Sequence, residues 1–394
     1  MAEPSFSLRQ IAVPAFGPSV LYGMANGAIL PVIAFSARDL DASVAVSGLV
    51  VALTGIGSLV SNVPAALVTS RFGERRAMVG AAIFAGLALV LCILARHVAM
   101  LAAGVFMMGM AGSVFALARQ SFLIEAVPIT LRARALSTLA GSMRIGVFIG
   151  PFAGAAMVHL IGLRGAYLVA LIAMVGVGFL ALAVPDLSYR ASAAEDGGPK
   201  PTIAGILRGH SRVFLTLGFG ALLVSALRSS RQVVIPLWAE QLGIAPATAS
   251  LVYGLAAAID MTVFYPAGRV MDRRGRAWVA VPSTLLMGCA LMAMTLTTGL
   301  PSFLAVTLAL GLGNGIGSGI IMTLGADASP RAGRTQFLGI WRMLSDVGAS
   351  SGPVLLSAIT ALFSLAAGMV TIGALGLAAA AVFWRWIPPW PAKR

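Results

Sequence analysis

Charged residues are scarce in this chain: they make up 10% of its 394 residues, whereas hydrophobic residues make up 59%. A water-soluble protein of this length needs a charged surface to stay dispersed, so the composition excludes an ordinary soluble globular fold. The mean hydropathy of +0.95 instead indicates a protein that lies in a lipid bilayer. Since one crossing takes about 20 apolar residues, the length predicts roughly twelve membrane-spanning helices.

Cysteine and histidine are also rare, with 2 and 3 residues respectively. Cys92 and Cys289 lie within apolar runs, where a thiol behaves as a small hydrophobic side chain. No histidine stands in a cluster of carboxylates or thiols at metal-ligand spacing, so we expect no metal site. The sequence also lacks a His-Glu-x-x-His segment, a phosphate-binding loop and a Cys-x-x-Cys pair. These absences argue against an enzyme and against a bound cofactor.

Lys and Arg outnumber Asp and Glu by 27 to 13. In a soluble protein this excess would suggest nucleic-acid binding, but in a membrane protein the position of each basic residue matters more, and we expect no nucleic-acid partner. Most Lys and Arg between the predicted spans fall on one side, while Arg38, Arg96 and Arg164 fall on the other. The positive-inside rule then places both termini and the central loop in the cytoplasm.

Twelve apolar runs give the predicted spans, with a first helix that we expect to be retained rather than cleaved. The predicted helices are 13–37, 44–69, 77–95, 99–126, 136–160, 166–185, 213–238, 247–270, 278–298, 303–327, 337–362 and 365–386. The one long polar break, residues 186–212, reads as a cytoplasmic linker in which residues 203–207 form a short surface helix. It divides the chain into predicted six-helix domains at 1–185 and 213–394.

The two halves of the chain repeat each other at a constant offset of 202 residues, as between Arg71 and Arg273. Further matching pairs are Gly73 and Gly275, Gly109 and Gly311, Pro128 and Pro330, and Pro151 and Pro353. A long apolar chain built from two similar halves is typical of secondary transporters, which bind their substrate between the repeats. The repeat therefore predicts a transporter, whereas an intramembrane enzyme would not require it.

Short loops rich in glycine and arginine follow the second and the eighth predicted spans. The later one reads Gly268, Asp272, Arg273, Gly275 and Arg276 at the spacing Gly-x-x-x-Asp-Arg-x-Gly-Arg, and the earlier one keeps Arg71, Gly73 and Arg75 but has Ala66 and Ser70 in place of the first glycine and the aspartate. The later copy resembles the signature loop of the major facilitator superfamily. That resemblance implies an all-α membrane protein with twelve transmembrane helices in two pseudo-symmetric six-helix domains.

A second motif lies in the fifth span, where Gly146, Gly150, Pro151 and Gly154 stand at the spacing Gly-x-x-x-Gly-Pro-x-x-Gly. It resembles the motif of the family's proton-coupled drug antiporters, which implies export. The arginine that the family often has in its fourth span is replaced here by Val105. Glycines give a helix a flat face and proline removes one backbone hydrogen bond, so this helix can pack closely and bend.

Both motifs are predicted to take part in gating. In the loops, a carboxylate beside arginines can hold neighbouring helix ends together. In the fifth span, the glycines and the proline allow the helix to pack closely and bend. We expect Arg71 or Arg75 to pair with Glu125, and Arg273 or Arg276 to pair with Asp327. An alternative is that these charges are solvated and serve only the positive-inside rule. The predicted gating residues are Arg71, Gly73, Arg75, Glu125, Gly268, Asp272, Arg273, Gly275, Arg276, Asp327, Gly146, Gly150 and Pro151.

Charged side chains inside the spans are costly in a bilayer and mark functional sites. Asp260 and Arg144 lie at similar depths in the eighth and fifth spans, so an interdomain pair that breaks during transport would make Asp260 a proton-coupling site; a static pair is the equal alternative. Arg342 and Asp346 are four residues apart on one helix face, which favours a simple ion pair, with Asp346 as a second proton-coupling candidate.

Arginines in the fourth and seventh spans predict the substrate site. Arg119 and Arg228, in helices that line the central cavity of the resembled fold, argue for a substrate with a negative or hydrogen-bond-accepting group. The predicted substrate-binding residues are Arg119, Arg228, Asn26, Tyr22, Arg231, Gln120 and Asn314.

These observations predict a proton-coupled exporter of small amphipathic molecules in the cytoplasmic membrane, in contact with lipids and acting as a monomer. The alternative is an uptake carrier for an organic anion or another nutrient on the same fold, because a fold does not set the direction of transport.

Overall fold

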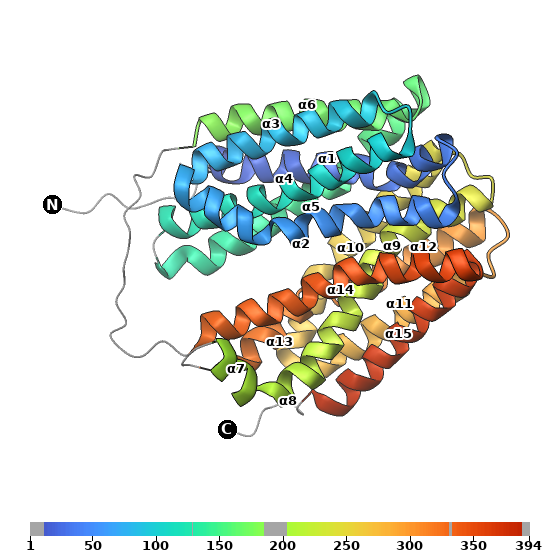
Figure 1. The fold of residues 1–394 in the computed structure, drawn as a ribbon. Helices are drawn as coiled ribbons and strands as arrows, with labels where there is room; N and C mark the ends of the chain where they lie inside the picture. The colour runs from blue at the N-terminus through green and yellow to red at the C-terminus, as the bar shows by residue number, and fades with distance from the viewer. Residues whose placement is uncertain (1–11, 128, 185–202, 331–332, 388–394) are drawn as a thin grey trace. The chain divides into compact units, whose positions relative to one another are not determined.

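The computed structural model describes residues 12–127, 129–184, 203–330 and 333–387. All regular structure in these residues is helical, and none of them lies in a β-strand (Figure 1). The expected all-α membrane fold is therefore confirmed, because long apolar runs can satisfy their backbone groups in lipid only by forming helices or closed barrels.

The first half of the chain forms six long helices. They are α1 (Ala12–Asp39), α2 (Val44–Phe72), α3 (Glu74–Ile93), α4 (Val98–Ala126), α5 (Ile129–Ile161) and α6 (Arg164–Leu182). Helix α5 begins seven residues before the predicted 136, because residues 129–135 are too polar to read as membrane-spanning although they are compatible with a helix. Pro151 lies inside α5 and does not end it.

The second half opens with the predicted surface helix and continues through another series of long helices. Its elements are α7 (Ile203–Gly209), α8 (Ser211–Val213), the π-helical turn η1 (Phe214–Gly218), α9 (Phe219–Gln241), α10 (Pro246–Arg274), α11 (Ala277–Met294), α12 (Leu300–Ile316), α13 (Ile320–Ala328), α14 (Arg334–Leu362) and α15 (Leu365–Trp386). In the described residues α8, η1 and α9 run together as one span, Ser211–Gln241.

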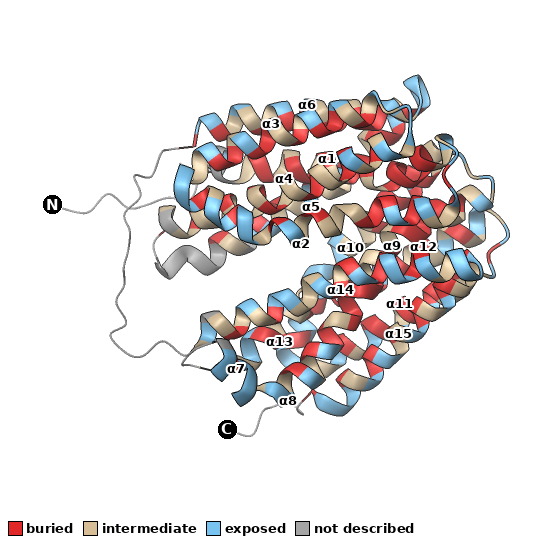
Figure 2. Ribbon diagram, viewed as in Figure 1, coloured by how far each residue is buried: buried red, intermediate tan, exposed pale blue. Residues whose placement is uncertain are grey.

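Eleven helical segments of the described chain are long and apolar enough to cross a membrane. The twelfth long helix, α14, falls outside that set because Arg342, Asp346 and several serines lower its apolar content. In Figure 2 the long helices carry buried and exposed stripes, and the exposed stripes include large apolar side chains such as Ile172 and Phe179 at 70% and 69% exposure. Apolar side chains on an outer surface fit contact with lipid rather than with water.

The predicted tenth span is present as Leu300–Ala328, but its helix is interrupted, because α12 ends at Ile316 and α13 begins at Ile320. Gly319, between them, has φ 84°, a left-handed conformation that glycine adopts without strain. Apolarity alone gave no sign of this break, because the hydrophobic residues continue on both sides of it. The ninth helix is shorter than predicted, because α11 ends at Met294 and the prediction extended to 298.

Glycines bring α1 and α5 into backbone contact. A Cβ atom at Gly146 would overlap the carbonyl oxygen of Val20, and one at Gly150 would overlap that of Met24. Helices α9 and α14 repeat this contact, since a Cβ at Gly348 would overlap the carbonyl oxygen of Leu222. Without a hydrophobic force between helices in lipid, such close approach supplies the dispersion contacts that hold them together.

The chain forms two compact units. Unit 1 comprises the described residues of Met1–Ala42, Leu53–Ser192 and Pro246–Gly254, and unit 2 comprises those of Ser43–Ala52, Ala193–Ala245 and Leu255–Arg394. The predicted domain limits at residues 185 and 213 stay a prediction, and most of the predicted linker lies outside the described residues. The sites below are described within one unit at a time.

Candidate substrate, proton and gating sites

In unit 2, Arg228 contacts the break between α12 and α13. It lies near the middle of the span Ser211–Gln241, and its Nη2 donates a hydrogen bond of 2.5 Å to the carbonyl oxygen of Gly317. A helix break frees backbone carbonyls that lipid cannot satisfy, so the half-buried guanidinium of Arg228 is a suitable donor there. A Cβ at Gly317 would lie 2.6 Å from this nitrogen, which explains why the position is glycine.

Asp260 stands at the middle of α10, where its carboxylate accepts a hydrogen bond from a neighbouring helix. Asn314 Nδ2 of α12 donates to Asp260 Oδ2 at 2.7 Å. The two helices meet closely because Gly315 lies against the backbone of Asp260, where a Cβ would be 2.8 Å from its Cα, and Gly311 lies against Ala256 in the same way. The predicted substrate residue Asn314 is thus a direct partner of the predicted proton site.

In unit 1, Arg119 lies about 10 Å from the C-terminal end of α4, at 1.5 Å per residue. Its Nη1 lies 3.6 Å from the Sδ atom of Met143, and its guanidinium carbon is 5.5 Å from the ring centre of Phe115. Its buried Nε has no hydrogen-bond partner among the described residues. The described surroundings of Arg119 are therefore a thioether, an aromatic ring and the nearby phenol of Tyr22, and the positive charge has no described carboxylate beside it.

Tyr22 and Asn26, two other predicted substrate residues, are connected to the surroundings of Arg119 by a stack of aromatic rings. The ring of Tyr22 on α1 stacks on Phe115 with centroids 4.7 Å apart. The Nδ2 of Asn26 donates to the carbonyl oxygen of Tyr22 at 3.0 Å, a contact within α1. Gln120 is half-buried on α4, directly after Arg119.

The remaining predicted intramembrane charges are Arg231, Arg144, Arg342 and Asp346. Arg231 is half-buried on α9, three residues after Arg228. Arg342 Nε lies 3.8 Å from Asp346 Oδ2 along α14, as expected for residues four apart. Arg144 is half-buried on α5 in unit 1, whereas Asp260 belongs to unit 2, so their interdomain pair stays a prediction.

The loop after α10 contains the ion pair expected there. Arg276 Nε donates to Asp327 Oδ2 on α13 at 2.8 Å, and Arg276 Nη1 donates to Asp272 Oδ1 at 3.4 Å and to the Met271 carbonyl oxygen at 3.0 Å. Gly275 adopts φ 98°, which requires glycine. One arginine therefore joins the ends of α10 and α13 to the start of α11.

The equivalent loop of unit 1 keeps the turn but differs at the charges. Gly73 has φ 79°, matching Gly275, while the exposed Arg71 packs over the ring of Phe72 at 5.7 Å. The side chain of Glu125, expected to pair with Arg71 or Arg75, lies outside the described residues. The repeat thus preserves the backbone turn, and Ser70 replaces the aspartate that contacts the arginine in unit 2.

Replacing Arg276 by Gln should shift the balance between inward-open and outward-open states by at most about fivefold. Asp327 is 49% exposed, and such a partly exposed ion pair contributes up to about 1 kcal/mol. Distance distributions between spin labels on the two halves would measure the shift. Arg273→Gln is the matched control, because it removes the same charge from the same loop without removing the contact with Asp327. An equal shift in both variants would mean that total loop charge, and not this contact, sets the balance.

Sequence reasoning missed two contacts, one in each unit. The first is Arg228 with Gly317, for which the alternating glycines at 311, 313, 315, 317 and 319 were the available signal. The second is a hydrogen bond from Ser113 Oγ on α4 to Asn62 Oδ1 on α2, 2.8 Å long, for which the isolated polar Asn62 was the only signal.

Known proteins share this fold. The model of the Major Facilitator Superfamily matches residues 19–228 and 217–394. Inner membrane transport protein YnfM of Escherichia coli (strain K12) is 24% identical over 177 residues, which cover 45% of this chain and 42% of that protein. The crystal structure of a D-xylose-proton symporter aligns with a TM-score of 0.78 at 16% identity, covering 97% of this chain and 98% of that one.

The structure of the human organic anion transporter MFSD10 aligns with a TM-score of 0.68 at 13% identity, covering 97% of this chain and 100% of that one. The match of the family model over both halves agrees with the helix arrangement of each unit and with the repeated loop. The chain belongs to the Major Facilitator Superfamily and is a multi-pass membrane transporter of that class.

Proposed function

We propose that this protein is a proton-coupled secondary transporter that exports small amphipathic molecules carrying a negative or hydrogen-bond-accepting group. The observation that carries the proposal is Arg119, a guanidinium within a membrane span whose described contacts are Met143 and Phe115. A charge in this setting costs about 3 kcal/mol on insertion scales, so it is retained for a function. An anionic group on the substrate would supply the missing counter-charge.

Asp260 is the proposed proton-binding group. It is the acidic residue at the middle of α10, and its Oδ2 accepts from Asn314. Carboxylates gain or lose a proton when their surroundings alternate between apolar and positively charged. We propose that alternating access changes the surroundings of Asp260 in this way, with Arg144 as the positive partner in one state. Asp346, which lies beside Arg342, is the second candidate for the proton-binding group.

The direction of transport is proposed from the stretch Gly146 to Gly154, which resembles the motif of drug antiporters. The name of YnfM gives transport across an inner membrane without a direction, and that of MFSD10 gives organic anions for that protein. Uptake of an organic anion remains the alternative, because the same fold serves a D-xylose-proton symporter. We place both termini in the cytoplasm by the positive-inside rule.

Purified protein in liposomes with an imposed pH gradient, offered anionic, cationic and neutral amphiphiles, tests the proposal. We expect an anionic amphiphile to move against the proton flow, and liposomes without protein to show no such movement. Movement in the same direction as the proton would support the uptake alternative. If no compound in the panel exchanges for protons, the antiporter proposal is wrong.

A further inference from the structure

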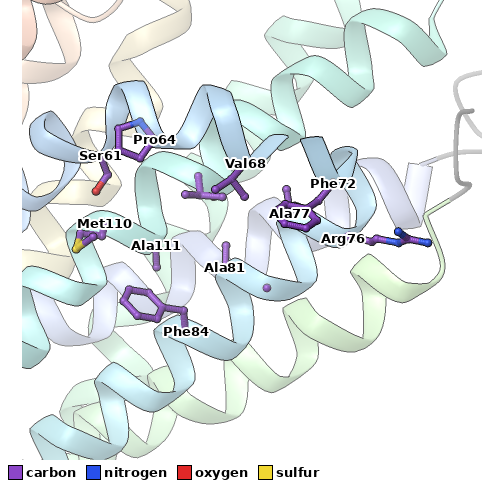
Figure 3. Close-up of a pocket in the computed structure, with 12 residues that line it drawn as sticks. Ser61, Pro64, Val68, Phe72, Arg76, Ala77, Ala81, Phe84, Met110 and Ala111 are labelled. Carbon is purple, nitrogen blue, oxygen red and sulfur yellow. The ribbon is translucent and has the colours of Figure 1, made fainter. Parts of the chain in front are cut away.

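Unit 1 contains an apolar crevice between α2, α3 and α4, with a volume of about 420 Å³. In Figure 3 its lining runs from Ser61 and Met110 at one end to Phe72 and Arg76 at the other. Arg76 is the one charged residue in this lining, and it stands at the end where α2 and α3 meet. None of the predicted substrate residues lines the crevice, so it is distinct from the site proposed above.

A second apolar groove follows the other side of α3, between α3 and α6. It has a volume of about 370 Å³ and runs along α3 from Val79 to Val90. It shares Val79, Ile83 and Leu182 with an adjoining cavity of about 490 Å³ that contains both Arg75 and Arg76. The crevice shares Arg76 and Gly80 with this cavity, so the two apolar grooves on either side of α3 both adjoin the cavity that contains the two arginines.

Three glycines in these linings have no packing reason to be glycine. A Cβ at Gly80, which lines the crevice and the arginine cavity, would meet no described atom within 4 Å. In the second groove, Cβ atoms at Gly86 and Gly178 would only reach ordinary contact, at 3.7 Å from Leu171 and 3.8 Å from Ala82. None of the three has a positive φ. Glycine weakens a helix relative to alanine, so these positions keep space open at a cost that the fold itself does not explain.

We propose that α3 is the binding site of one anionic phospholipid, with an acyl chain on each side of the helix and the phosphate on Arg75 and Arg76. Because Gly80 has no side chain, it leaves open space at the point where the two acyl chains separate below the headgroup. From Arg76 to Val90 the helix rises about 21 Å at 1.5 Å per residue. That exceeds half of the roughly 30 Å hydrocarbon core, so the grooves can hold the acyl chains of one leaflet.

The charges favour an anionic headgroup over a zwitterionic one. Neither Arg75 nor Arg76 forms an ion pair with a described carboxylate, and both lie on the side where the positive-inside rule puts the cytoplasm. Anionic lipids are enriched in that leaflet, and guanidinium groups bind phosphate oxygens with paired hydrogen bonds. The apolar channels then distinguish a whole lipid from a free phosphate.

Native mass spectrometry of the full chain in detergent can measure this site. Delipidated protein would be titrated with phosphatidylglycerol and with phosphatidylcholine of the same acyl chains. We expect the first phosphatidylglycerol to bind about thirtyfold more tightly, which at 1.4 kcal/mol per tenfold corresponds to about 1 kcal/mol for each arginine. Glycerol phosphate, which has the headgroup charge without chains, should not compete.

Matched variants separate the headgroup from the chains. Arg75→Gln with Arg76→Gln should remove the preference for phosphatidylglycerol, whereas Arg96→Gln, at the far end of the α3–α4 hairpin, should not. Gly80→Phe, which fills open space, should weaken the binding of both lipids, whereas Ile172→Phe, on the exposed face of α6 outside the grooves, should not.

Three results would overturn the proposal. The first is a preference for phosphatidylglycerol that survives the double arginine variant. The second is competition by glycerol phosphate, which would mean a phosphate site without chains. The third is a Gly80→Phe variant that binds lipid normally but no longer transports, which would make the crevice an entry path for the substrate. Gel filtration of each variant checks that it is folded.

Discussion

Replacing Asp260 by Asn is expected to abolish proton-driven transport while leaving substrate exchange intact. The amide of Asn keeps an oxygen that accepts the hydrogen bond from Asn314 Nδ2, so the contact between α10 and α12 survives. The carboxylate that would bind and release the proton is gone. In liposomes, uphill movement driven by a pH gradient should fall to the level of empty vesicles, while exchange of labelled for unlabelled substrate without a gradient should continue.

The repeat supplies a matched control for this prediction. Ser58 occupies the position equivalent to Asp260 in the first half, so Ser58→Ala changes the same place in α2 without touching a carboxylate. We expect both activities to persist in that variant. If Asp260→Asn still drives uphill transport at the wild-type rate, Asp260 is a structural partner of Asn314, and Asp346 becomes the residue to test next. Loss of both activities would instead point to a folding defect, which the melting temperature would reveal.

The helices could be predicted from the sequence because, in a bilayer, a sufficiently long run of apolar residues nearly always forms a membrane-spanning helix. Runs of about 20 apolar residues have one stable structure in lipid, which is why spans such as α4 and α15 agree with their predictions to within a residue or so. The two short turns that contain glycine and arginine could also be predicted from the sequence. The positive φ of Gly73 and of Gly275 is a local requirement, and the repeat displays it twice.

The polar contacts could not be predicted in the same way, because they depend on which helix faces meet. Asp260 and Asn314 are 54 residues apart, and only the close approach of α10 and α12 at Gly315 brings them together. Arg228 is 89 residues from Gly317, and its contact further requires the helix break. The break itself depends on tertiary satisfaction of freed backbone groups, which a local pattern does not encode.

The repeat also locates where the two halves differ. Gly109 and Gly311 make equivalent close contacts with Thr54 and with Ala256 in their own units. Beside these conserved contacts the polar pairs diverge: Asn314 meets Asp260 in unit 2, whereas Ser113 meets Asn62 in unit 1. Helix packing explains the contacts that both units share. It does not require the carboxylate of Asp260, which has no counterpart in the first half of the chain.

Replacing Arg119 by Gln should weaken binding of an anionic substrate by roughly 10- to 150-fold. A hydrogen bond to a charged group contributes about 1.5–3 kcal/mol, and Gln retains a polar donor without the charge. Binding of a neutral analogue should change far less. Stability should not fall, because the described neighbours of Arg119 are Met143, Phe115 and Tyr22, none of them a charged partner, and removing a charge from a membrane span relieves its desolvation. Calorimetric titration of both ligands against wild type and variant measures the difference.

Arg228→Gln serves as the contrasting variant, because this arginine also satisfies the Gly317 carbonyl oxygen at the helix break. The shorter Gln side chain cannot reach that oxygen, so the variant should lose thermal stability as well as affinity, whereas Arg119→Gln should lose affinity alone. Arg96→Gln, outside the predicted spans, controls for net charge. If Arg119→Gln weakens the anionic and the neutral ligand equally, Arg119 shapes the site without reading charge, and the substrate need not be an anion. If Arg228→Gln loses stability but keeps its affinity, Arg228 belongs to the helix break, and Arg119 is left as the arginine that selects the substrate.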